Sequence, residues 1–549
     1  MQPATKRILW IDDEVERFEP HLLFLRQRGY HVDTTTNGDD AVAMARGQSY
    51  DLVLLDEQMP GRRGLDVLGE LRQEEPHARI VMVTKSEEDR TLVEAIGRRV
   101  DEYLVKPASP RQILSVVTRL LEGQQLQQQR VAQDFAARFG QLTRMRDEAE
   151  HWRHFFALYN ELVDWELRLF DAGEPGLVES VRSLLDDVRR AYGQYVVREY
   201  AGWVAPNDAQ PGGRTSGSDR QDPAARDGAW ASDRDRPPLS TDLIERSVVP
   251  LLGGGPVLLV VIDCIRLDQW RVLRPLLGAE FDVDESLYAS ILPTATPYAR
   301  NAIFGGMFPD EIARAHPDWW GTEEGSLNSF EDELLRAQLR RLTGRDVPVH
   351  YEKVFTDSDS DDVVARVRNA LGGSDGVVAV VYNFVDLLTH GRSESAILME
   401  VARDVPALRA LTRQWFERSS AFRVLREAAL RGAPAIFTTD HGSIHCERPL
   451  TIYARRDATN NLRYKFGHDL RVDEQDKVLA LRDERKLRFP RAKRMATNYM
   501  LALEDCFFVY PTKLREYQAR YRGSFLHGGV SPEEMILPVA VLRPRRAAP

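Results

Sequence analysis

The sequence predicts a multidomain α/β protein in which two α/β domains are separated by a helical middle segment and a linker. The chain has 549 residues, and at about 100–200 residues per domain this length predicts three or four units. Short apolar runs alternate with amphipathic stretches near both ends of the chain, as in parallel sheets covered by helices. A composition of 43% hydrophobic and 29% charged residues is ordinary for globular domains and excludes wholesale disorder.

Charge and cysteine content exclude several classes of protein. A net charge of -10 and a pI near 5.8 argue against a protein that coats nucleic acid by bulk electrostatics. The three cysteines (Cys264, Cys446 and Cys506) are too widely spaced for a disulfide framework or a cysteine-based zinc module, and they fit a reducing compartment. The N-terminus lacks the apolar segment of a signal peptide, and the longest apolar run, Pro256–Ile262, is far shorter than the roughly 20 residues of a membrane-spanning helix. We therefore expect a cytoplasmic protein without membrane insertion.

Residues 1–122 are predicted to form a doubly wound domain with a parallel sheet, because strand-like runs alternate with helical patterns. In chain order, strands are expected at Arg7–Ile11, His31–Thr35, Leu52–Leu55, Ile80–Val83 and Tyr103–Val105. Helices are expected at Val15–Arg28, Asp39–Arg46, Leu65–Arg72, Glu87–Ile96 and Arg111–Leu121.

The remainder of the chain divides into three segments by composition. Residues 123–204 contain few helix breakers and carry aromatics at helical spacing, which predicts a helical bundle or connector. Residues 205–240 are rich in Gly, Pro, Ser, Asp and Arg and bury too little apolar surface to offset their ordering entropy, so a flexible linker or disordered insertion is expected. Residues 241–549 again alternate, with strands expected in VLLVVID, VVAVVYNFVD, APAIFTTDHG and MILPVAVL, and form a second, larger α/β unit.

Polar residues close the predicted strands of residues 1–122. They are Asp12 and Asp13, Asp56, Thr84 and Lys106. In an open parallel sheet the carboxyl ends of neighbouring strands meet at one edge, where ligands bind. Clustered carboxylates at that edge would repel one another unless they held a hard divalent cation, and oxygen ligands suit magnesium. The lysine adds a positive charge suited to a phosphoryl group.

The motifs WIDDE, LLDEQMPGRRGLDVL, VTKS and YLVKP resemble those of a response-regulator receiver domain with its flavodoxin-like fold, over residues 1–122. The resemblance implies that Asp56 is the phosphoacceptor for a sensor histidine kinase. It also implies that Asp12, Asp13 and Asp56 hold magnesium together with the backbone carbonyl of Gln58. The charge of phosphoryl transfer would be neutralised by the magnesium ion and the lysine.

The same resemblance assigns the residues that read out phosphorylation. Thr84 is implied as the switch hydroxyl, Tyr103 as the switch aromatic and Lys106 as the partner of the phosphate. Phosphorylation of Asp56 would attract the Thr84 hydroxyl and let Tyr103 move inward. A change of charge at Asp56 would in this way alter the surface of the domain at a distance from the phosphorylated residue.

The last domain carries dispersed Asp and His residues in four groups, three of which lie at or just beyond predicted strands and are expected at the same sheet edge. They are Asp263, Asp386, His390, Asp440, His441 and His527. Histidine with carboxylate and no thiolate is typical of a catalytic rather than a structural zinc site. A hydroxyl nucleophile, Thr294 or Thr296, stands at a predicted helix start in ILPTATPYARNAIFGG. A basic recognition helix is not found near the C-terminus, which argues against DNA-binding output.

Five motifs of residues 245–545 together resemble the alkaline phosphatase superfamily, and more closely its PglZ-type branch. They are VIDCIRLDQW, LPTATPYARNAIFGG, DxxxH, TTDHG and LHGGVSPEEMILP. The order of receiver, helical segment and PglZ-type domain resembles that of PorX-type response regulators. The resemblance implies two zinc ions, one held by Asp386, His390 and His527, and the other by Asp263, Asp440, His441 and the threonine nucleophile. Thr296 is implied as that nucleophile because the second threonine of PTxT takes this role in the family, with Thr294 in reserve.

We therefore expect a two-component response regulator in which phosphorylation of Asp56 controls a two-zinc phosphodiesterase, and in which the phosphorylated chain forms a homodimer through its helical middle. The expected substrates are nucleotide-type phosphodiesters such as linear or cyclic oligonucleotides, and a phosphomonoesterase is one alternative. The alternative from another class is a regulatory module that binds a sigma factor or a secretion-system component with little or no catalysis. The basic run Leu481–Arg494 is either a solvated face or a contact for a phosphate backbone, with Arg491, Lys493 and Arg494 as the residues that would distinguish the two.

Overall fold

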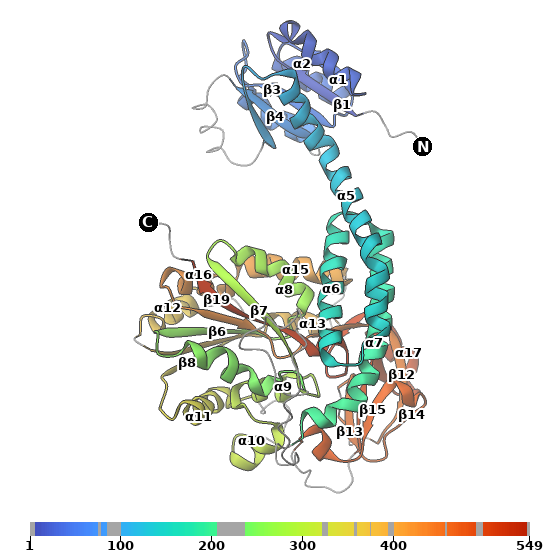
Figure 1. Cartoon of the computed structure of the whole chain (residues 1–549), viewed down its shortest axis with the longest axis vertical. Coiled ribbons are helices and arrows are strands. Elements are labelled where there is room, and N and C mark those ends of the chain that lie inside the picture. The colour runs from blue at the N-terminus through green and yellow to red at the C-terminus, as the bar shows by residue number, and fades with distance from the viewer. Residues whose placement is uncertain are drawn as a thin grey trace, which may run out of the picture. The chain divides into compact units, whose positions relative to one another are not determined.

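The computed structural model divides the chain into two compact units (Figure 1). One consists of Met1–Arg138 and Arg168–Leu177, and the other of Phe139–Leu167 and Val178–Pro549. The structure describes residues 6–74, 78–84, 100–205, 236–320, 328–355, 360–373, 375–392, 400–455, 458–459, 461–489 and 498–545.

The first unit contains a parallel sheet in the order β2-β1-β3-β4-β5. Its strands are β1 (Arg7–Ile11), β2 (His31–Thr35), β3 (Leu52–Asp56), β4 (Arg79–Thr84) and β5 (Glu102–Val105). The described helices are α1 (Glu19–Gln27), α2 (Gly38–Gly47) and α3 (Gly64–Glu74). Alternate residues of β1 enter two separate cores, Leu9 and Ile11 on one face and Ile8 and Trp10 on the other. The doubly wound fold predicted from the sequence is thereby confirmed.

One helix predicted for this unit differs from the structure, and another lies outside the described residues. The prediction of one helix over Val15–Arg28 is wrong, because a short 3-10 turn at Val15–Phe18 precedes α1. Pro20 lies in the first turn of α1, where its missing N–H costs no hydrogen bond and its ring favours a new helix start. The helix predicted at Glu87–Ile96 lies outside the described residues.

The middle of the chain is helical, as predicted, but its first helix is longer than expected. Helix α5 runs without interruption over Pro110–Asp147, whereas the sequence predicted one helix ending at Leu121 and a separate connector. Gly123 is the one breaker near that boundary, and a single glycine costs only about 1 kcal/mol in a helix. Helices α6 (Trp152–Asp171) and α7 (Pro175–Trp203) follow.

The predicted linker 205–240 is shorter than expected at its C-terminal end. Residues 206–235 lie outside the described part of the chain, but Pro237–Ser240 are buried. The Ala289 N–H donates to the carbonyl of Pro238 at 2.8 Å, and Leu239 bridges to Ala289. The predicted linker extended too far because its C-terminal boundary was drawn from composition, which does not separate Pro237–Ser240 from the polar stretch before them. Pro237 and Leu239 are nevertheless apolar and pack in the structure.

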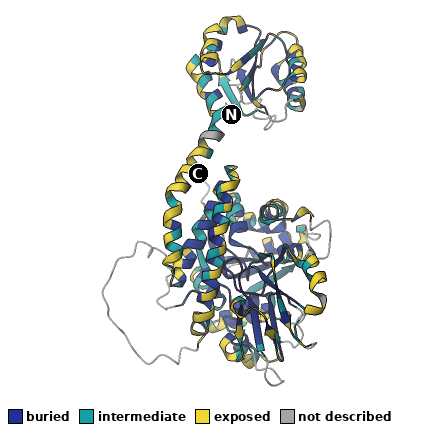
Figure 2. Ribbon diagram, turned by 90° about the vertical axis from the view of Figure 1, so that its right-hand side faces the viewer, coloured by how far each residue is buried: buried dark blue, intermediate teal, exposed yellow. Residues whose placement is uncertain are grey.

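The second unit is built on a six-stranded sheet in the order β7-β19-β10-β6-β9-β8. Its strands are β6 (Pro256–Ile262), β7 (Phe281–Ala289), β8 (Val349–Val354), β9 (Gly376–Tyr382), β10 (Ala435–Thr438) and β19 (Ile536–Pro544). Strands β10, β6, β9 and β8 are parallel, and β19 is antiparallel to β10 and β7. Strands β6, β9, β10 and β19 are almost wholly buried (Figure 2), which explains their near-continuous apolar sequences. The edge strands β7 and β8 are partly exposed and carry more polar residues.

Helices flank this sheet in the second unit. They are α8 (Leu267–Leu273), α9 (Thr296–Gly305), α10 (Pro309–Ala315), α11 (Glu331–Thr343), α12 (Ser360–Ala370), α13 (Phe384–Arg392), α15 (Val405–Arg418) and α16 (Ser420–Leu430). None of the described helices of the chain combines the length and the apolar character that a membrane crossing needs.

Smaller sheets, not predicted from the sequence, occupy residues 444–526. Strand β12 (Arg448–Tyr453) pairs with β14 (Arg471–Val472) and β17 (Cys506–Val509), while β16 (Asn498–Ala502) pairs with β13 (Tyr464–Gly467) and β15 (Val478–Leu481). A third pair joins β11 (Ile444–Cys446) to β18 (Ser524–Leu526), and two short helices, α17 (Leu514–Tyr521) and α18 (Pro532–Met535), complete the region.

Candidate metal centres

The ends of three neighbouring parallel strands bring acidic residues together in the second unit. Asp263 directly follows β6, Asp440 follows β10, and Asp386 lies in the first turn of α13, after β9. The backbone turns at Cys264, whose φ of 67° lies in the left-handed region, and the Cys264 N–H donates to Asp440 Oδ1 at 3.4 Å. The sheet edge expected from the sequence is therefore the place where these carboxylates meet.

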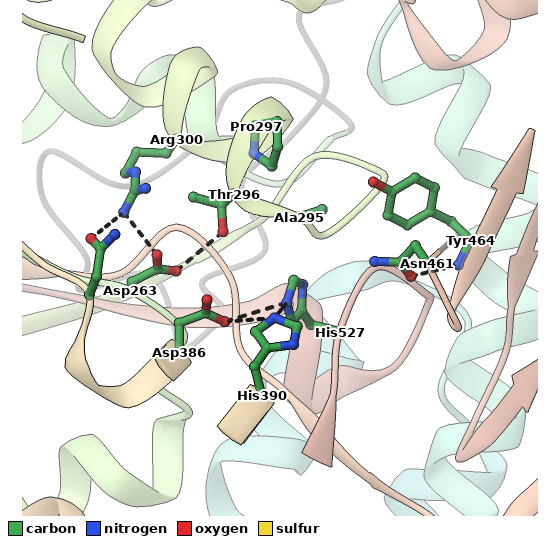
Figure 3. A pocket seen from close by; sticks show the side chains of 11 residues that line it. Asp263, Ala295, Thr296, Pro297, Arg300, Asp386, His390, Asn461, Tyr464 and His527 are labelled. Atoms are coloured by element: carbon green, nitrogen blue, oxygen red, sulfur yellow. Dashed lines mark hydrogen bonds and ion pairs between the residues drawn. The ribbon is translucent and has the colours of Figure 1, made fainter. Parts of the chain in front are cut away.

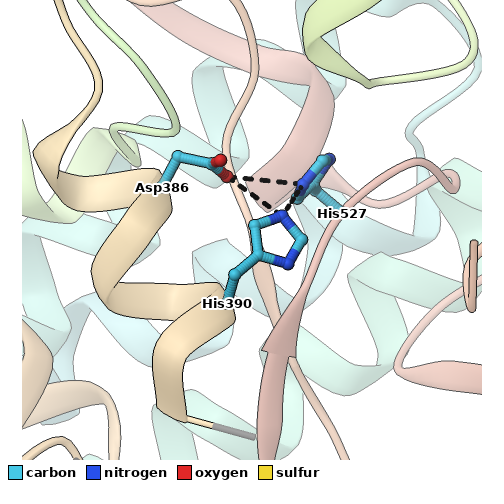
Figure 4. Close-up of side chains that lie close together, drawn as sticks. All are labelled: Asp386, His390 and His527. Carbon is cyan, nitrogen blue, oxygen red and sulfur yellow. Dashed lines mark hydrogen bonds and ion pairs between the residues drawn. The ribbon is translucent and has the colours of Figure 1, made fainter. Parts of the chain in front are cut away.

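The first cluster consists of Asp386, His390 and His527 (Figure 4). The two imidazole Nε2 atoms are 2.9 Å apart, and they lie 3.3 and 3.4 Å from Asp386 Oδ1. Asp386 and His390 are separated by four residues on α13, so they share a helix face, while His527 follows β18.

The donor chemistry of this cluster fits a cation. His527 Nδ1 lies 3.1 Å from the carbonyl of Thr294, and a proton on Nδ1 leaves the Nε2 lone pair facing Asp386. Asp386 Oδ1 is buried and has no hydrogen bond. Two nitrogens and one oxygen converging in this way are ligands suited to zinc.

The second cluster consists of Asp263, Asp440 and His441, all of them buried. His441 Nε2 lies 3.5 Å from Asp263 Oδ1 and 3.9 Å from Asp440 Oδ2, and Asp440 Oδ2 has no hydrogen bond. Burial lowers the pKa of His441 to about 4, which keeps the ring neutral near pH 7. Burial and the neighbouring Asp440 carboxylate raise the pKa of Asp263 well above its usual range. This cluster also has the composition of a divalent cation site.

The two threonines of the PTAT segment lie in different environments. Thr296 is the first residue of α9, and its hydroxyl lies 3.0 Å from His441 Nε2 and 3.5 Å from Asp263 Oδ1. Thr294 is fully buried, where its hydroxyl donates to the Gly529 carbonyl at 2.9 Å and accepts from the Gly528 N–H at 3.0 Å. Thr296 therefore faces the second cluster, whereas the Thr294 hydroxyl ties the PTAT segment to the loop that carries His527.

A buried arginine supports the second cluster, and the sequence analysis did not single it out. Arg300, one turn after Thr296 on α9, donates to Asp263 Oδ2 at 3.0 Å and to Asn383 Oδ1 at 3.2 Å. Its Nε donates to Glu331 Oε1 at 2.8 Å. Such outer contacts fix the orientation of a ligating carboxylate. The i, i+4 spacing of Thr296 and Arg300 was visible in the sequence, but their common target was not.

Glu534 is a second buried support that the sequence analysis missed. It accepts hydrogen bonds from the Gly529 N–H at 2.8 Å, from Ser531 Oγ at 2.8 Å and from the guanidinium of Arg463 at 2.5 and 3.2 Å. Both side chains of the Arg463–Glu534 pair are completely buried. This carboxylate therefore holds the loop of His527 against the turn that contains Arg463.

Both clusters border one pocket of about 340 Å³ (Figure 3). Its lining residues are Asp263, Ala295, Thr296, Pro297, Arg300, Asn383, Asp386, His390, Asn461, Tyr464 and His527. Thr296, the three members of the first cluster and Asp263 of the second thus face the same space, which is large enough for a phosphoryl group and part of its substituents.

The first unit contains a third cluster at the carboxyl edge of its sheet, formed by Asp12, Asp13 and Asp56. Lys106 Nζ donates to Asp12 Oδ2 at 2.7 Å and to Asp56 Oδ2 at 2.8 Å. Burial raises the pKa of Asp56 despite the opposing effect of Lys106. Asp13 Oδ1 is buried without a hydrogen bond, as expected of an oxygen that would contact a cation. Three carboxylates beside one lysine fit magnesium.

The remaining predicted residues of this unit surround the same edge. Thr84 is buried at the end of β4, and its carbonyl accepts from the Lys106 N–H at 2.8 Å. The Gln58 N–H lies 3.5 Å from Asp56 Oδ1. Tyr103, in β5, is half-buried and packs against the core on one side of the sheet. In the basic run of the second unit, the predicted contacts Arg491, Lys493 and Arg494 lie outside the described residues.

Family models match three consecutive segments of the chain. The response regulator receiver domain matches residues 8–118, the PorX response regulator linker domain matches residues 125–204, and the BREX system PglZ alkaline phosphatase-like domain matches residues 243–542. These three domains in this order confirm the PorX-type architecture inferred from the motifs.

Individual relatives match the first of these segments. ResD of Bacillus subtilis, a transcriptional regulatory protein, is 36% identical over 120 residues, which are 22% of this chain and 50% of ResD. The probable transcriptional regulatory protein TcrX of Mycobacterium tuberculosis is 33% identical over 120 residues, 22% of this chain and 50% of TcrX. The crystal structure of TrrA from Thermotoga maritima with Mg²⁺ and BeF is 37% identical and covers 21% of this chain and 100% of that chain, with a TM-score of 0.20. The chain spans about half the length of these two curated relatives.

Proposed function

Because the chain belongs to the PglZ family, with a PglZ alkaline phosphatase-like domain behind a response regulator receiver domain and a PorX linker domain, we propose that its phosphatase-like output is a two-zinc phosphodiesterase controlled by the receiver. The receiver domain implies a phosphodonor such as a histidine kinase. The observation that carries the proposal is the placement of one threonine hydroxyl beside the second Asp/His cluster, in a pocket that the first cluster also borders.

The charge of the pocket favours a phosphodiester over a phosphomonoester. A monoester approaches with up to two negative charges, whereas a diester carries one. Arg300 is the cation among the described lining residues, and its guanidinium is already bound to Asp263, Glu331 and Asn383. Among the lining residues that the structure describes, no guanidinium is therefore left to balance a second charge on the phosphoryl group. Nucleotide-type diesters, including linear or cyclic oligonucleotides, are the proposed substrates.

The proposed reaction is an in-line displacement at phosphorus. Two zinc ions, one in each cluster, would supply the charge that lowers the pKa of the Thr296 hydroxyl and stabilises the leaving oxygen. Thr296 Oγ1 attacks phosphorus while its hydroxyl proton passes to water, and the bond from phosphorus to the leaving alkoxide breaks as the alkoxide takes up a proton from water and leaves as the alcohol. Water then attacks the phosphothreonine, releasing the phosphomonoester and restoring the hydroxyl. Arg300 orients Asp263, and the Thr294 carbonyl orients His527 through its Nδ1–H.

The first expected result is a preference for diesters. Zinc-loaded protein should hydrolyse bis-p-nitrophenyl phosphate with a kcat/KM at least about tenfold above that for p-nitrophenyl phosphate, a difference of roughly 1.4 kcal/mol in transition-state stabilisation. Initial rates measured by nitrophenolate absorbance test this. A preference for the monoester would replace the diesterase with a phosphomonoesterase. Protein that carries no zinc and hydrolyses neither ester would instead support the regulatory binding module.

The second expected result concerns the receiver. Asp56→Asn should accept no phosphoryl group from acetyl phosphate and magnesium, because an amide lacks the nucleophilic carboxylate. Intact-mass spectrometry should detect one added phosphoryl group on the wild type and none on the variant. In light scattering, beryllofluoride should convert the wild type, but not Asp56→Asn, from monomer to homodimer.

The control for this experiment is Asp39→Asn, which removes an exposed carboxylate at the start of α2 that does not belong to the Asp12, Asp13 and Asp56 cluster. This variant should gain the phosphoryl group as the wild type does. Phosphorylation of Asp56→Asn would show that another residue is the phosphoacceptor, and an unchanged wild-type mass in light scattering would refute the phosphorylation-dependent homodimer.

A further inference from the structure

Asn461 directs a hydrogen-bond donor into the pocket. Its Oδ1 accepts from the Arg463 N–H at 2.8 Å and from the Tyr464 N–H at 3.2 Å, so the oxygen of the amide must face the backbone. The amide nitrogen consequently points the other way, into the pocket between Tyr464 and His527 (Figure 3). Within the described part of the chain, this nitrogen has no acceptor.

The turn that carries Asn461 is fixed against the loop of the ligand His527. Gly528 has a φ of 113°, and a Cβ at this position would lie 2.5 Å from a ring carbon of Tyr464 and 3.1 Å from Asn461 Oδ1. Arg463, between Asn461 and Tyr464, is anchored by its buried pair with Glu534. The absence of a side chain at Gly528 thus allows the turn to pack directly beside the first cluster, and the position of the donor is set before any ligand binds.

We propose that Asn461 is a substrate-binding residue whose side-chain N–H donates to a non-bridging oxygen of the phosphoryl group. The assignment rests on the proposed function, because it places a phosphoryl group between the two clusters. A neutral donor suits the single negative charge of a diester, and it contacts an oxygen that the attacking and leaving groups leave free. Its fixed direction means that little rotational freedom is lost when it binds.

Aspartate at position 461 separates this role from a structural one. In Asn461→Asp an oxygen remains to accept from the Arg463 and Tyr464 N–H groups, so the turn is preserved. The donor to the substrate is lost and replaced by a negative charge that repels phosphate. Asn461→Ala removes the acceptor and the donor together. Asn369→Ala, on the exposed face of α12, is the matched control for loss of an asparagine amide.

The experiment measures the affinity of zinc-loaded protein for inorganic phosphate by calorimetry, together with zinc content, thermal midpoint and kcat/KM for bis-p-nitrophenyl phosphate. Asn461→Asp is expected to keep its zinc and its thermal midpoint while its Kd for phosphate and its kcat/KM worsen by about 10–100-fold, the range of a hydrogen bond to a charged group. Asn461→Ala should lose affinity and also melt earlier, and Asn369→Ala should match the wild type.

The outcomes distinguish this inference from the proposed function. Wild-type affinity and kcat/KM in Asn461→Asp would overturn the role of Asn461 and leave the phosphodiesterase intact. Zinc-loaded wild type that binds phosphate but hydrolyses no diester would overturn the phosphodiesterase, and the Kd of Asn461→Asp would still decide the role of Asn461. Zinc-loaded wild type that binds no phosphate would overturn the role of Asn461.

Discussion

Thr296→Ala is expected to lower kcat for bis-p-nitrophenyl phosphate by about 10⁴-fold or more, the range found when a covalent nucleophile is removed. The reason is the position of its hydroxyl, 3.0 Å from His441 Nε2 and 3.5 Å from Asp263 Oδ1, at the N-terminus of α9. The thermal midpoint should change little, because Thr296 is half-buried and its hydroxyl is not part of the packed core. Stopped-assay kinetics with matched zinc content measure the effect.

Two further threonine variants act as controls. Thr296→Ser keeps a hydroxyl on α9 and should retain measurable turnover. Thr294→Ala should instead lower the free energy of unfolding by about 1–3 kcal/mol, because it leaves the buried Gly528 N–H without its acceptor. If Thr294→Ala abolishes turnover in a stably folded protein while Thr296→Ala does not, the nucleophile is Thr294.

Removal of the metal ions is also expected to have a large effect. The rate of diester hydrolysis should fall by about 10³-fold or more, and the thermal midpoint should fall by several degrees. Without a cation, the buried carboxylates of Asp263 and Asp440 lie together and repel each other, and a ligand that binds only the folded state stabilises it. Dialysis against a chelator followed by activity assays and calorimetry tests this. Adding back zinc should restore both properties, and magnesium should not.

Variants of single ligands refine the same experiment. His527→Ala and Asp263→Asn, one from each cluster, are each expected to bind one zinc ion fewer per chain by metal analysis. His316→Ala, which removes a histidine of the same unit that belongs to neither cluster, should keep the wild-type zinc content. Full activity after exhaustive removal of metal, in protein that remains folded, would be incompatible with the two-zinc mechanism.

The sequence predicted those parts of the fold that depend on patterns among neighbouring residues. The strands of the first sheet and the four buried strands β6, β9, β10 and β19 of the second were predicted from their apolar residues, because such strands are covered on both faces. The edge strands β7 and β8 of the second sheet were missed, since they are partly exposed and mix polar with apolar residues. The small sheets at residues 444–526 were missed, since their short strands mix charged and apolar residues, as in Arg448–Tyr453. The single helix α5 was missed as a unit because no local signal shows whether a helix continues through Gly123.

Most residues of the three metal-type clusters could be selected from the sequence because they follow strands at the carboxyl edge of one or the other main sheet. His390 and His527 were selected through the resemblance of the DxxxH and LHGG motifs. The residues that hold these ligands in place could not be selected from the sequence. Arg300 and Glu331 are bonded to each other from different helices, and Glu534 holds Arg463 across 71 positions of the chain. Contacts of this kind depend on the paths of distant segments, which local residue patterns do not encode.

The sequence by itself determined a receiver joined to a phosphatase-like domain, the order of the segments and the residue types of each cluster. Only the tertiary structure decided that Thr296 faces the clusters while the Thr294 hydroxyl is bonded to Gly528 and Gly529. It alone also placed Asn461 in the wall of the pocket. The physical reason is that periodicity and strand ends assign a residue to an edge, whereas the direction of a side chain at that edge follows from the hydrogen bonds it makes with segments remote in sequence.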